Sequence, residues 1–161
     1  MRRALLSLVL ALAATLAGAA EPPGAEALFA AKLLTPDGVA ASLAASRGRP
    51  MIVNFWARWC TPCREEIPEL VRAHEARRGV DIVGIDIGEE PAAVREFMRA
   101  YEMSYRVLVA RDDGLELLVA LGNPHANLPY TLAIDRRGRI AGRRLGVLTR
   151  AHLDALLESL R

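Results

Sequence analysis

The sequence predicts an α/β domain of three layers, in which a mixed β-sheet lies between helices. Two mostly apolar segments, 51–57 and 80–87, are typical of strands that are buried on both faces. Each is followed by a segment with apolar residues at helical spacing. The pattern ends with two further strands around a turn at 135–138 and a last helix, which favours the α/β class.

Local signals place each element along the chain. Apolar and β-branched residues between turn residues predict the strands, and apolar residues three or four positions apart predict the helices. In chain order, the expected strands are 32–34, 51–57, 80–87, 105–109, 130–134 and 139–145. The expected helices are a single turn at 42–45, a long helix from Pro62 that ends before Gly79, then 91–101, 113–121 and a last helix capped by Thr149.

The first twenty residues have the pattern of a secretory signal peptide. A basic start at Arg2 and Arg3 precedes an apolar run and a stretch of small residues at 17–20. The apolar run is shorter than the roughly 20 residues that a membrane span needs, which disfavours the alternative of an uncleaved membrane anchor. The sequence therefore predicts a signal peptide over 1–20, a mobile linker over 21–31 and one domain over 32–161.

Cleavage of this leader would leave a nearly neutral domain. The chain has 21 basic and 19 acidic residues, and removing Arg2 and Arg3 leaves 19 of each. A neutral balance without a basic stripe predicts no nucleic-acid partner. We expect a soluble domain without stable membrane insertion, located in the periplasm or otherwise exported, where disulfides persist.

The only two cysteines of the chain, Cys60 and Cys63, are two residues apart. A disulfide between them would be a poor structural staple, because a four-residue loop contributes roughly 2 kcal/mol and a fifteen-residue loop about 3. The spacing therefore favours reversible thiol–disulfide exchange. The cysteine pair itself would be the redox group, and no separate cofactor is expected.

Three segments give the chain a resemblance to a known family. The segment NFWARWCTPCREEIP at 54–68 is followed by VDIVGIDIGEE and then by LPYTLAIDRRGRI. These motifs resemble the thioredoxin superfamily and are most similar to the exported TlpA/ResA-like thiol–disulfide oxidoreductases. The resemblance covers nearly all of the chain after about residue 33. It implies a thioredoxin fold, with a central mixed β-sheet flanked by helices, an N-terminal β extension and a central insert.

The resemblance also assigns roles within the cysteine motif. Cys60 is the expected exposed nucleophile at a helix N-terminus, where unpaired N–H groups and the helix dipole favour a thiolate. Cys63, one turn further, is the expected buried thiol that resolves the mixed disulfide. The dipeptide Thr61-Pro62 between them lacks the histidine of strongly oxidising relatives. Without that local cation the thiolate is less stabilised, which favours a more reducing couple.

A second motif predicts where substrate binds. The superfamily has a cis-proline opposite its cysteines, and Pro129 matches that position, so that Leu128 would present its backbone to an extended substrate. The alternative is an ordinary turn proline. Trp59 is expected to cover Cys60 and to offer an apolar docking surface. Trp56 could serve either the site or the core.

Glu66 is the third candidate catalytic residue. It lies three residues after Cys63 and therefore on the same side of the helix. Asn54 stands where cytosolic thioredoxins have a buried aspartate, so the proton acceptor for the resolving step must come from elsewhere. The resemblance implies that Glu66 tunes the cysteines and relays protons, with Glu65 facing water. The alternative is a solvated carboxylate at the start of a helix.

The expected function is reduction of disulfides in exported proteins, with electrons from a membrane thiol electron transporter. The alternatives are a disulfide oxidase or isomerase and a copper- or zinc-handling protein. Zinc needs three or four ligands, whereas His74, His125 and His152 are scattered, so no metal is expected. A role in cytochrome c biogenesis is in doubt, because Tyr130 stands where that subfamily has an acidic residue. Arg64 after Cys63 disfavours covalent haem.

Overall fold

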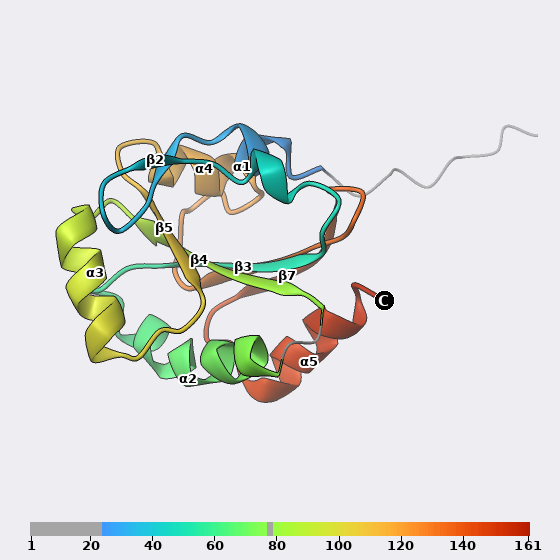
Figure 1. Ribbon diagram of the computed structural model, residues 1–161. Coiled ribbons are helices and arrows are strands. Elements are labelled where there is room, and N and C mark those ends of the chain that lie inside the picture. The colour runs from blue at the N-terminus through green and yellow to red at the C-terminus, as the bar shows by residue number, and fades with distance from the viewer. Residues whose placement is uncertain (1–23, 77–78) are drawn as a thin grey trace, which may run out of the picture.

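In the computed structural model, which describes residues 24–76 and 79–161, a seven-stranded sheet crosses the domain (Figure 1). The strand order is β2-β1-β5-β4-β3-β6-β7. The strands are β1 (Leu33–Leu34), β2 (Ala40–Ala41), β3 (Met51–Trp56), β4 (Asp81–Ile87), β5 (Arg106–Ala110), β6 (Tyr130–Ile134) and β7 (Ile140–Leu145). The helices are α1 (Glu26–Ala30), α2 (Thr61–Glu75), α3 (Pro91–Ala100), α4 (Gly114–Ala120) and α5 (Arg150–Glu158), with a 3₁₀ turn at Ala44–Ser46. The expected signal peptide lies outside the described residues.

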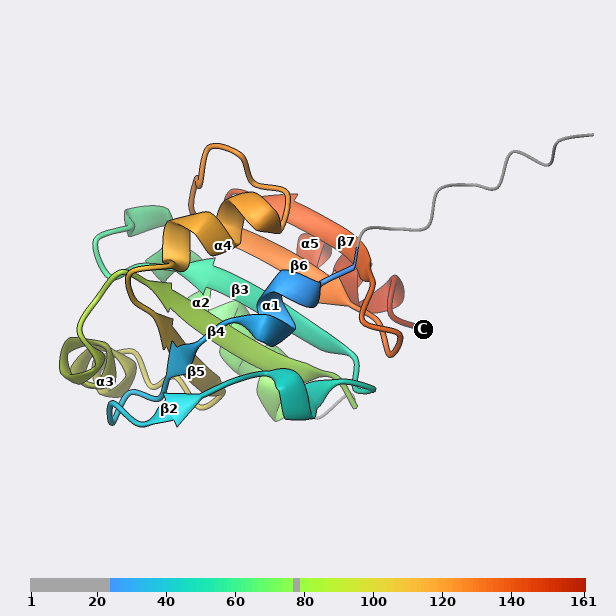
Figure 2. The ribbon, with the colours of Figure 1, turned by 90° about the horizontal axis from the view of Figure 1, so that it is seen from above.

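The sheet is mixed, as the sequence predicts. Strands β3, β4 and β5 run parallel, whereas β6 and β7 continue from β3 as antiparallel neighbours. At the other edge β1 and β2 form the N-terminal β extension, and β5, the strand that follows α3 in the central insert, lies between β1 and β4. Helices α1 and α4 cover one face of the sheet, and α2 and α5 cover the other (Figures 1 and 2).

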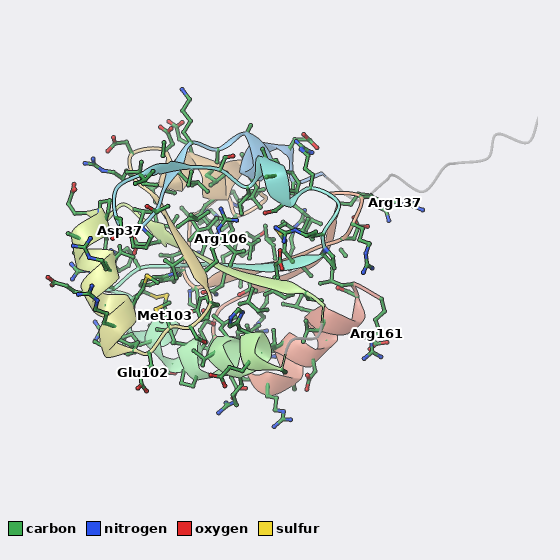
Figure 3. All side chains as sticks on the ribbon, in the orientation of Figure 1. Asp37, Glu102, Met103, Arg106, Arg137 and Arg161 are labelled. Atoms are coloured by element: carbon green, nitrogen blue, oxygen red, sulfur yellow. A yellow bond between two sulfur atoms is a disulfide. The ribbon has the colours of Figure 1, made fainter. Side chains whose placement is uncertain are left out.

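Two apolar cores result from this layering, one on each face of the sheet. Alternate residues of β3 enter different cores: Val53 and Phe55 pack with α1 and α4, and Ile52 and Trp56 with α2 and α5. All six residues of β3 are buried, which explains its continuous apolar pattern. Side chains fill the space between the layers, and charged residues such as Arg161 lie at the surface (Figure 3).

The N-terminal segment is part of the domain, and the expected linker over 21–31 is therefore wrong from residue 24 on. Helix α1 buries Leu28 completely and leaves Phe29 only 3% exposed. The Ala25 backbone N–H donates a hydrogen bond to the Gly138 carbonyl at 2.9 Å, and the Arg47 guanidinium lies over the Phe29 ring. The five-residue helix has only two large apolar side chains, Leu28 and Phe29, which are adjacent and therefore show no helical spacing.

We expect Phe29→Ala to lower the free energy of unfolding by about 3 kcal/mol, because it removes a buried ring and leaves a cavity. Denaturant unfolding measures the difference. Val39→Ala is the control, since that side chain is 61% exposed and its loss should change stability by no more than about 0.5 kcal/mol. Equal stability of the two variants would mean that α1 does not contribute to the fold.

Candidate active site

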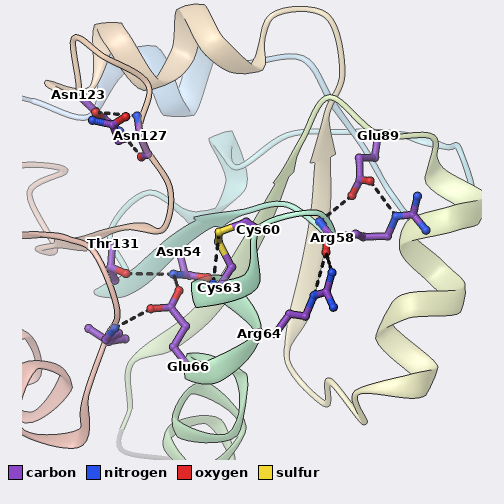
Figure 4. The surroundings of a disulfide bond; sticks show 11 residues. Asn54, Arg58, Cys60, Cys63, Arg64, Glu66, Glu89, Asn123, Asn127 and Thr131 are labelled. Carbon is purple, nitrogen blue, oxygen red and sulfur yellow. Dashed lines mark hydrogen bonds and ion pairs between the residues drawn. A yellow bond between two sulfur atoms is a disulfide. The ribbon is translucent and has the colours of Figure 1, made fainter.

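Helix α2 begins directly after Cys60, so that the cysteine motif lies at a helix N-terminus (Figure 4). Cys60 is the N-cap, and its Sγ accepts a hydrogen bond from the Cys63 backbone N–H at 3.3 Å. The two sulfurs form a disulfide with a Cα–Cα distance of 5.3 Å. After reduction, the same N–H and the positive end of the helix dipole would favour a thiolate at Cys60 over a thiol.

Both cysteines are nearly buried. The exposed fraction is 5% for Cys60 and 1% for Cys63. The expectation of a buried Cys63 is confirmed, whereas that of an exposed Cys60 is wrong for the disulfide-bonded chain. The physical reason is that the Cys60 side chain turns inward to its partner sulfur and packs in the same apolar cluster as Ile67.

The exposed part of the motif is formed by the loop before α2 and the first turn of the helix. Trp59 is 67% exposed, and Thr61 and Pro62 are exposed beside it. Trp56 is only 1% exposed, and its ring stacks on Phe97 with 5.1 Å between the ring centroids. Of the two alternatives for Trp56, core packing is confirmed. The docking role of Trp59 stays a prediction.

Glu66 lies at the centre of a buried hydrogen-bond network that joins three elements (Figure 4). One carboxylate oxygen accepts from Asn54 Nδ2 at 2.7 Å, and the other accepts from the Leu148 backbone N–H at 2.7 Å. The Asn54 amide also donates to the Thr131 hydroxyl at 3.0 Å. Glu66 is completely buried, whereas Glu65 is exposed, so the alternative of a solvated Glu66 is wrong.

Burial changes the proton affinity of this carboxyl. Removal from water raises the pKa of Glu66 to about 7, while the hydrogen bonds from Asn54 and from the Leu148 N–H act in the opposite direction. A carboxyl that titrates near neutral pH can both accept and release a proton there. The geometry therefore suits Glu66 to proton transfer, and this role itself stays a prediction.

The loop before β6 contains the second predicted motif. The Leu128–Pro129 peptide bond is cis, as expected. Two hydrogen bonds fix the loop just before it, because the Asn123 side chain donates to the Asn127 carbonyl at 2.8 Å and accepts from its N–H at 3.2 Å. That Leu128 and Pro129 bind substrate stays a prediction. Asn123 was not predicted, since no pattern in the sequence marks an asparagine that binds its own loop.

Sequence reasoning also missed the residues that hold the loop between β3 and α2. Glu89, in the loop before α3, accepts hydrogen bonds from the Arg58 backbone N–H at 2.9 Å and from Arg58 Nε at 2.8 Å. Arg64 donates through Nε and Nη2 to the Arg58 carbonyl, at 3.0 and 2.7 Å. The Arg58 guanidinium is paired with the Glu89 carboxylate and the Arg64 guanidinium with the Arg58 carbonyl, so both side chains hold the loop that precedes Cys60.

Asp86, near the end of β4, is a second buried carboxyl on this side of the sheet. It is fully buried, and its Oδ1 accepts a hydrogen bond from the Glu89 backbone N–H at 3.3 Å. Burial and the neighbouring Glu89 carboxylate raise the pKa of Asp86 well above its usual range. The single signal in the sequence is an aspartate inside an otherwise apolar strand, which a strand pattern alone does not interpret.

Two further findings concern the described residues. Within 24–76 and 79–161, no three or more His, Cys, Asp or Glu side chains are placed to hold a metal ion. In the same part of the chain, no helix combines the length and the apolar character that crossing a membrane requires.

The fold and this site define a thioredoxin-like protein with a cysteine pair at the N-terminus of a helix. The Redoxin family matches residues 20–157, and the chain belongs to this family. The chain is 30% identical over 118 residues to the thiol-disulfide oxidoreductase ResA of Geobacillus thermodenitrificans, covering 71% of this chain and 65% of ResA. The ResA of Bacillus subtilis is 31% identical over 105 residues, 64% of this chain and 56% of that protein. The chain thus spans 65% and 56% of the length of these two relatives, less than two thirds of each.

Solved structures have the same fold. A thiol:disulfide interchange protein of the thioredoxin family from Chlorobium tepidum superposes with a TM-score of 0.69 at 29% identity, over 87% of this chain and 97% of that one. A secreted disulfide oxidoreductase of Mycobacterium tuberculosis gives a TM-score of 0.70 at 22% identity, over 84% and 98% of the two chains. The predicted thioredoxin fold is confirmed.

Proposed function

We propose that this chain is an exported thiol–disulfide oxidoreductase that reduces disulfides of other exported proteins. The observation that carries the proposal is the disulfide between Cys60 and Cys63 at the N-terminus of α2, beside the buried carboxyl of Glu66. The names of the ResA relatives support the same chemistry.

The proposed reaction passes through one mixed disulfide. In the reduced protein, the Cys60 thiolate attacks a sulfur of the substrate disulfide, forms the mixed disulfide and releases one substrate thiolate. Cys63 then attacks the Cys60 sulfur, closes the disulfide that the structure contains, and releases the second substrate thiol. Two electrons pass to the substrate, and the cysteine pair is left oxidised.

Glu66 is proposed to accept the proton of Cys63 in the resolving step. The resolving thiol must lose its proton to become a nucleophile, and Cys63 is almost inaccessible to water. Glu66 lies one turn further along the same helix and titrates near neutral pH because of its burial. Asn54 cannot take a proton at physiological pH, so its proposed role is to orient the Glu66 carboxylate through an amide that also donates to Thr131.

Two partners complete the proposal. The substrates are exported proteins with accessible disulfides, and a membrane thiol electron transporter regenerates the reduced cysteine pair. The expected signal peptide would bring the domain into the periplasm or another exported location. Mass spectrometry of the protein purified from its native compartment tests this: a chain that begins after Ala19 or Ala20 supports export, and a retained leader supports a membrane-anchored form.

The reduction potential of the Cys60–Cys63 couple tests the direction of the reaction. We expect a value at or below about −250 mV, near the range of thioredoxin, which requires delivered electrons. A value near about −120 mV, as in the strongly oxidising DsbA, would overturn the reductase and make the protein a disulfide donor. The oxidase or isomerase is the second candidate, and a potential near that higher value is the result that would favour it.

A further inference from the structure

The backbone of Arg58 is held on both sides, two residues before Cys60 (Figure 4). Its N–H donates to Glu89, which also receives the Arg58 Nε, and its carbonyl accepts two N–H groups from Arg64. We name these contacts the Arg58 clamp. The clamp joins the loop between β3 and α2 to the start of α2 and to the loop before α3.

The clamp restricts the direction in which the chain leaves Arg58. Arg58 and Trp59 are the two central residues of a turn that the Cys60 N–H closes on the Ala57 carbonyl at 3.1 Å, and the clamp adds hydrogen bonds at both the N–H and the carbonyl of Arg58, which further restrict its φ and ψ. All four bonds involve a charged partner, and such bonds are stronger than neutral ones. The Glu89 side chain is only 11% exposed, so solvent screens its ion pair with Arg58 less than that of a surface pair.

The residue whose direction is fixed is Trp59. Its large side chain is 67% exposed, whereas the Cys60 that follows is 5% exposed. An exposed tryptophan next to a recessed reactive sulfur is suited to anchor a protein surface, because aromatic anchors dominate interface energies. Anchoring is more favourable when the side chain is already ordered, since binding then costs less conformational entropy.

We propose that Glu89 is a positioning residue that, together with Arg64, preorganises Trp59 for the docking of protein disulfides. The inference rests on the proposed function, because it assigns Trp59 to the contact with the substrate protein. A small disulfide has no surface for Trp59 to hold and reaches Cys60 without this contact. Loss of the clamp should therefore slow the reduction of protein disulfides more than the reduction of small disulfides.

The experiment compares two disulfides with the reduced protein and its variants. Insulin is the protein substrate, and glutathione disulfide is the small one. We expect Glu89→Ala to lower kcat/KM for insulin about tenfold, mainly through KM, and to change the rate with glutathione disulfide less than about twofold. Glu89→Gln keeps an oxygen that can accept from the Arg58 N–H, and should recover most of the loss.

Glu90→Ala is the matched control. Glu90 is the next residue, and it pairs with Arg111 at 2.7 Å on the surface without a contact to Arg58. Glu90→Ala should reduce insulin and glutathione disulfide at the same rates as the unchanged protein. If Glu89→Ala and Glu90→Ala give the same rate with insulin, or if Glu89→Ala loses both substrates equally, the positioning role is refuted.

A second measurement does not depend on the proposed function. Amide hydrogen exchange and indole NMR signals report whether the Arg58 N–H is protected and Trp59 ordered. Glu89→Ala should speed the exchange of the Arg58 N–H and make the Trp59 indole more mobile. Glu90→Ala should change neither signal. Unchanged signals in Glu89→Ala would refute the clamp itself. Failure of the unchanged protein to reduce insulin would instead refute the proposed reductase, while the NMR result still decides the clamp.

Discussion

Cys60→Ser is expected to abolish reduction of protein disulfides, whereas Cys63→Ser is expected to accumulate mixed disulfides with its partners. The difference follows from the position of the two residues. Cys60 is the N-cap of α2, and its sulfur accepts a hydrogen bond from the Cys63 N–H. The helix N-terminus therefore stabilises a thiolate at Cys60. Cys63 is 1% exposed and can reach only the sulfur of Cys60.

Turnover assays and non-reducing mass spectrometry of the two variants check this expectation. Cys60→Ser should form no adduct with insulin, and the insulin adduct of Cys63→Ser should persist until a small thiol is added. The reverse pattern, with adducts through Cys63 alone, would exchange the two roles. Normal turnover in both variants would exclude the proposed mechanism altogether.

Glu66→Gln is expected to remove a large part of the pH dependence of stability. The pKa of Glu66 is about 7 in the folded chain and has an ordinary value of 4.5. The folded state therefore binds this proton more tightly than the unfolded state. The resulting stability is fully present below pH 4.5 and is lost as the pH rises through about 7. The difference in pKa corresponds to a loss of about 3 kcal/mol.

Denaturant unfolding from about pH 4 to about pH 8, a range that brackets both pKa values of Glu66, measures this loss. Glu65→Gln is the matched control, because that carboxyl is the exposed neighbour on the same helix. Asp86 also has a raised pKa and leaves some slope in every variant. The comparison of Glu66→Gln with Glu65→Gln therefore isolates Glu66. If the free energy of unfolding depended on pH equally in these two variants, Glu66 would not ionise near neutral pH.

The same pair of variants tests the proposed proton transfer. Alkylation of the reduced cysteines as a function of pH should shift in Glu66→Gln, since the neighbouring charge that opposes thiolate formation is gone. Glu65→Gln should retain the profile of the unchanged protein. An alkylation profile that is identical in both variants would leave Glu66 a structural residue.

Much of the fold could be predicted because its strongest signals are long and periodic. The buried strands β3 and β4 appear as mostly apolar runs, interrupted by Asn54 in the first and by Asp86 in the second, and α2, α3 and α5 have an apolar face. Helix α1 could not be predicted, since a five-residue helix shows no period and gains its stability from Phe29 in the core. β2 was also missed, because its two alanines carry no strand signal.

The parts of the candidate site that could be predicted are those whose chemistry requires a particular residue type in a recognisable motif. The cysteines, Glu66 and the cis bond at Pro129 follow from motifs. The burial of Cys60 and the contacts of Glu89 could not be predicted, because they depend on how separate loops pack. Arg58 and Glu89 are 31 positions apart, and no spacing rule connects them.

The attachment of α1 has a consequence for the order in which the chain folds. Gly24 and Ala25 bind the turn at Gly138 and Arg139, near the other end of the sequence. Contacts at such a separation close a long loop and form late, after the hairpin of β6 and β7 exists. Because a polypeptide is made from its N-terminus, α1 would stay undocked until the hairpin of β6 and β7 has been made.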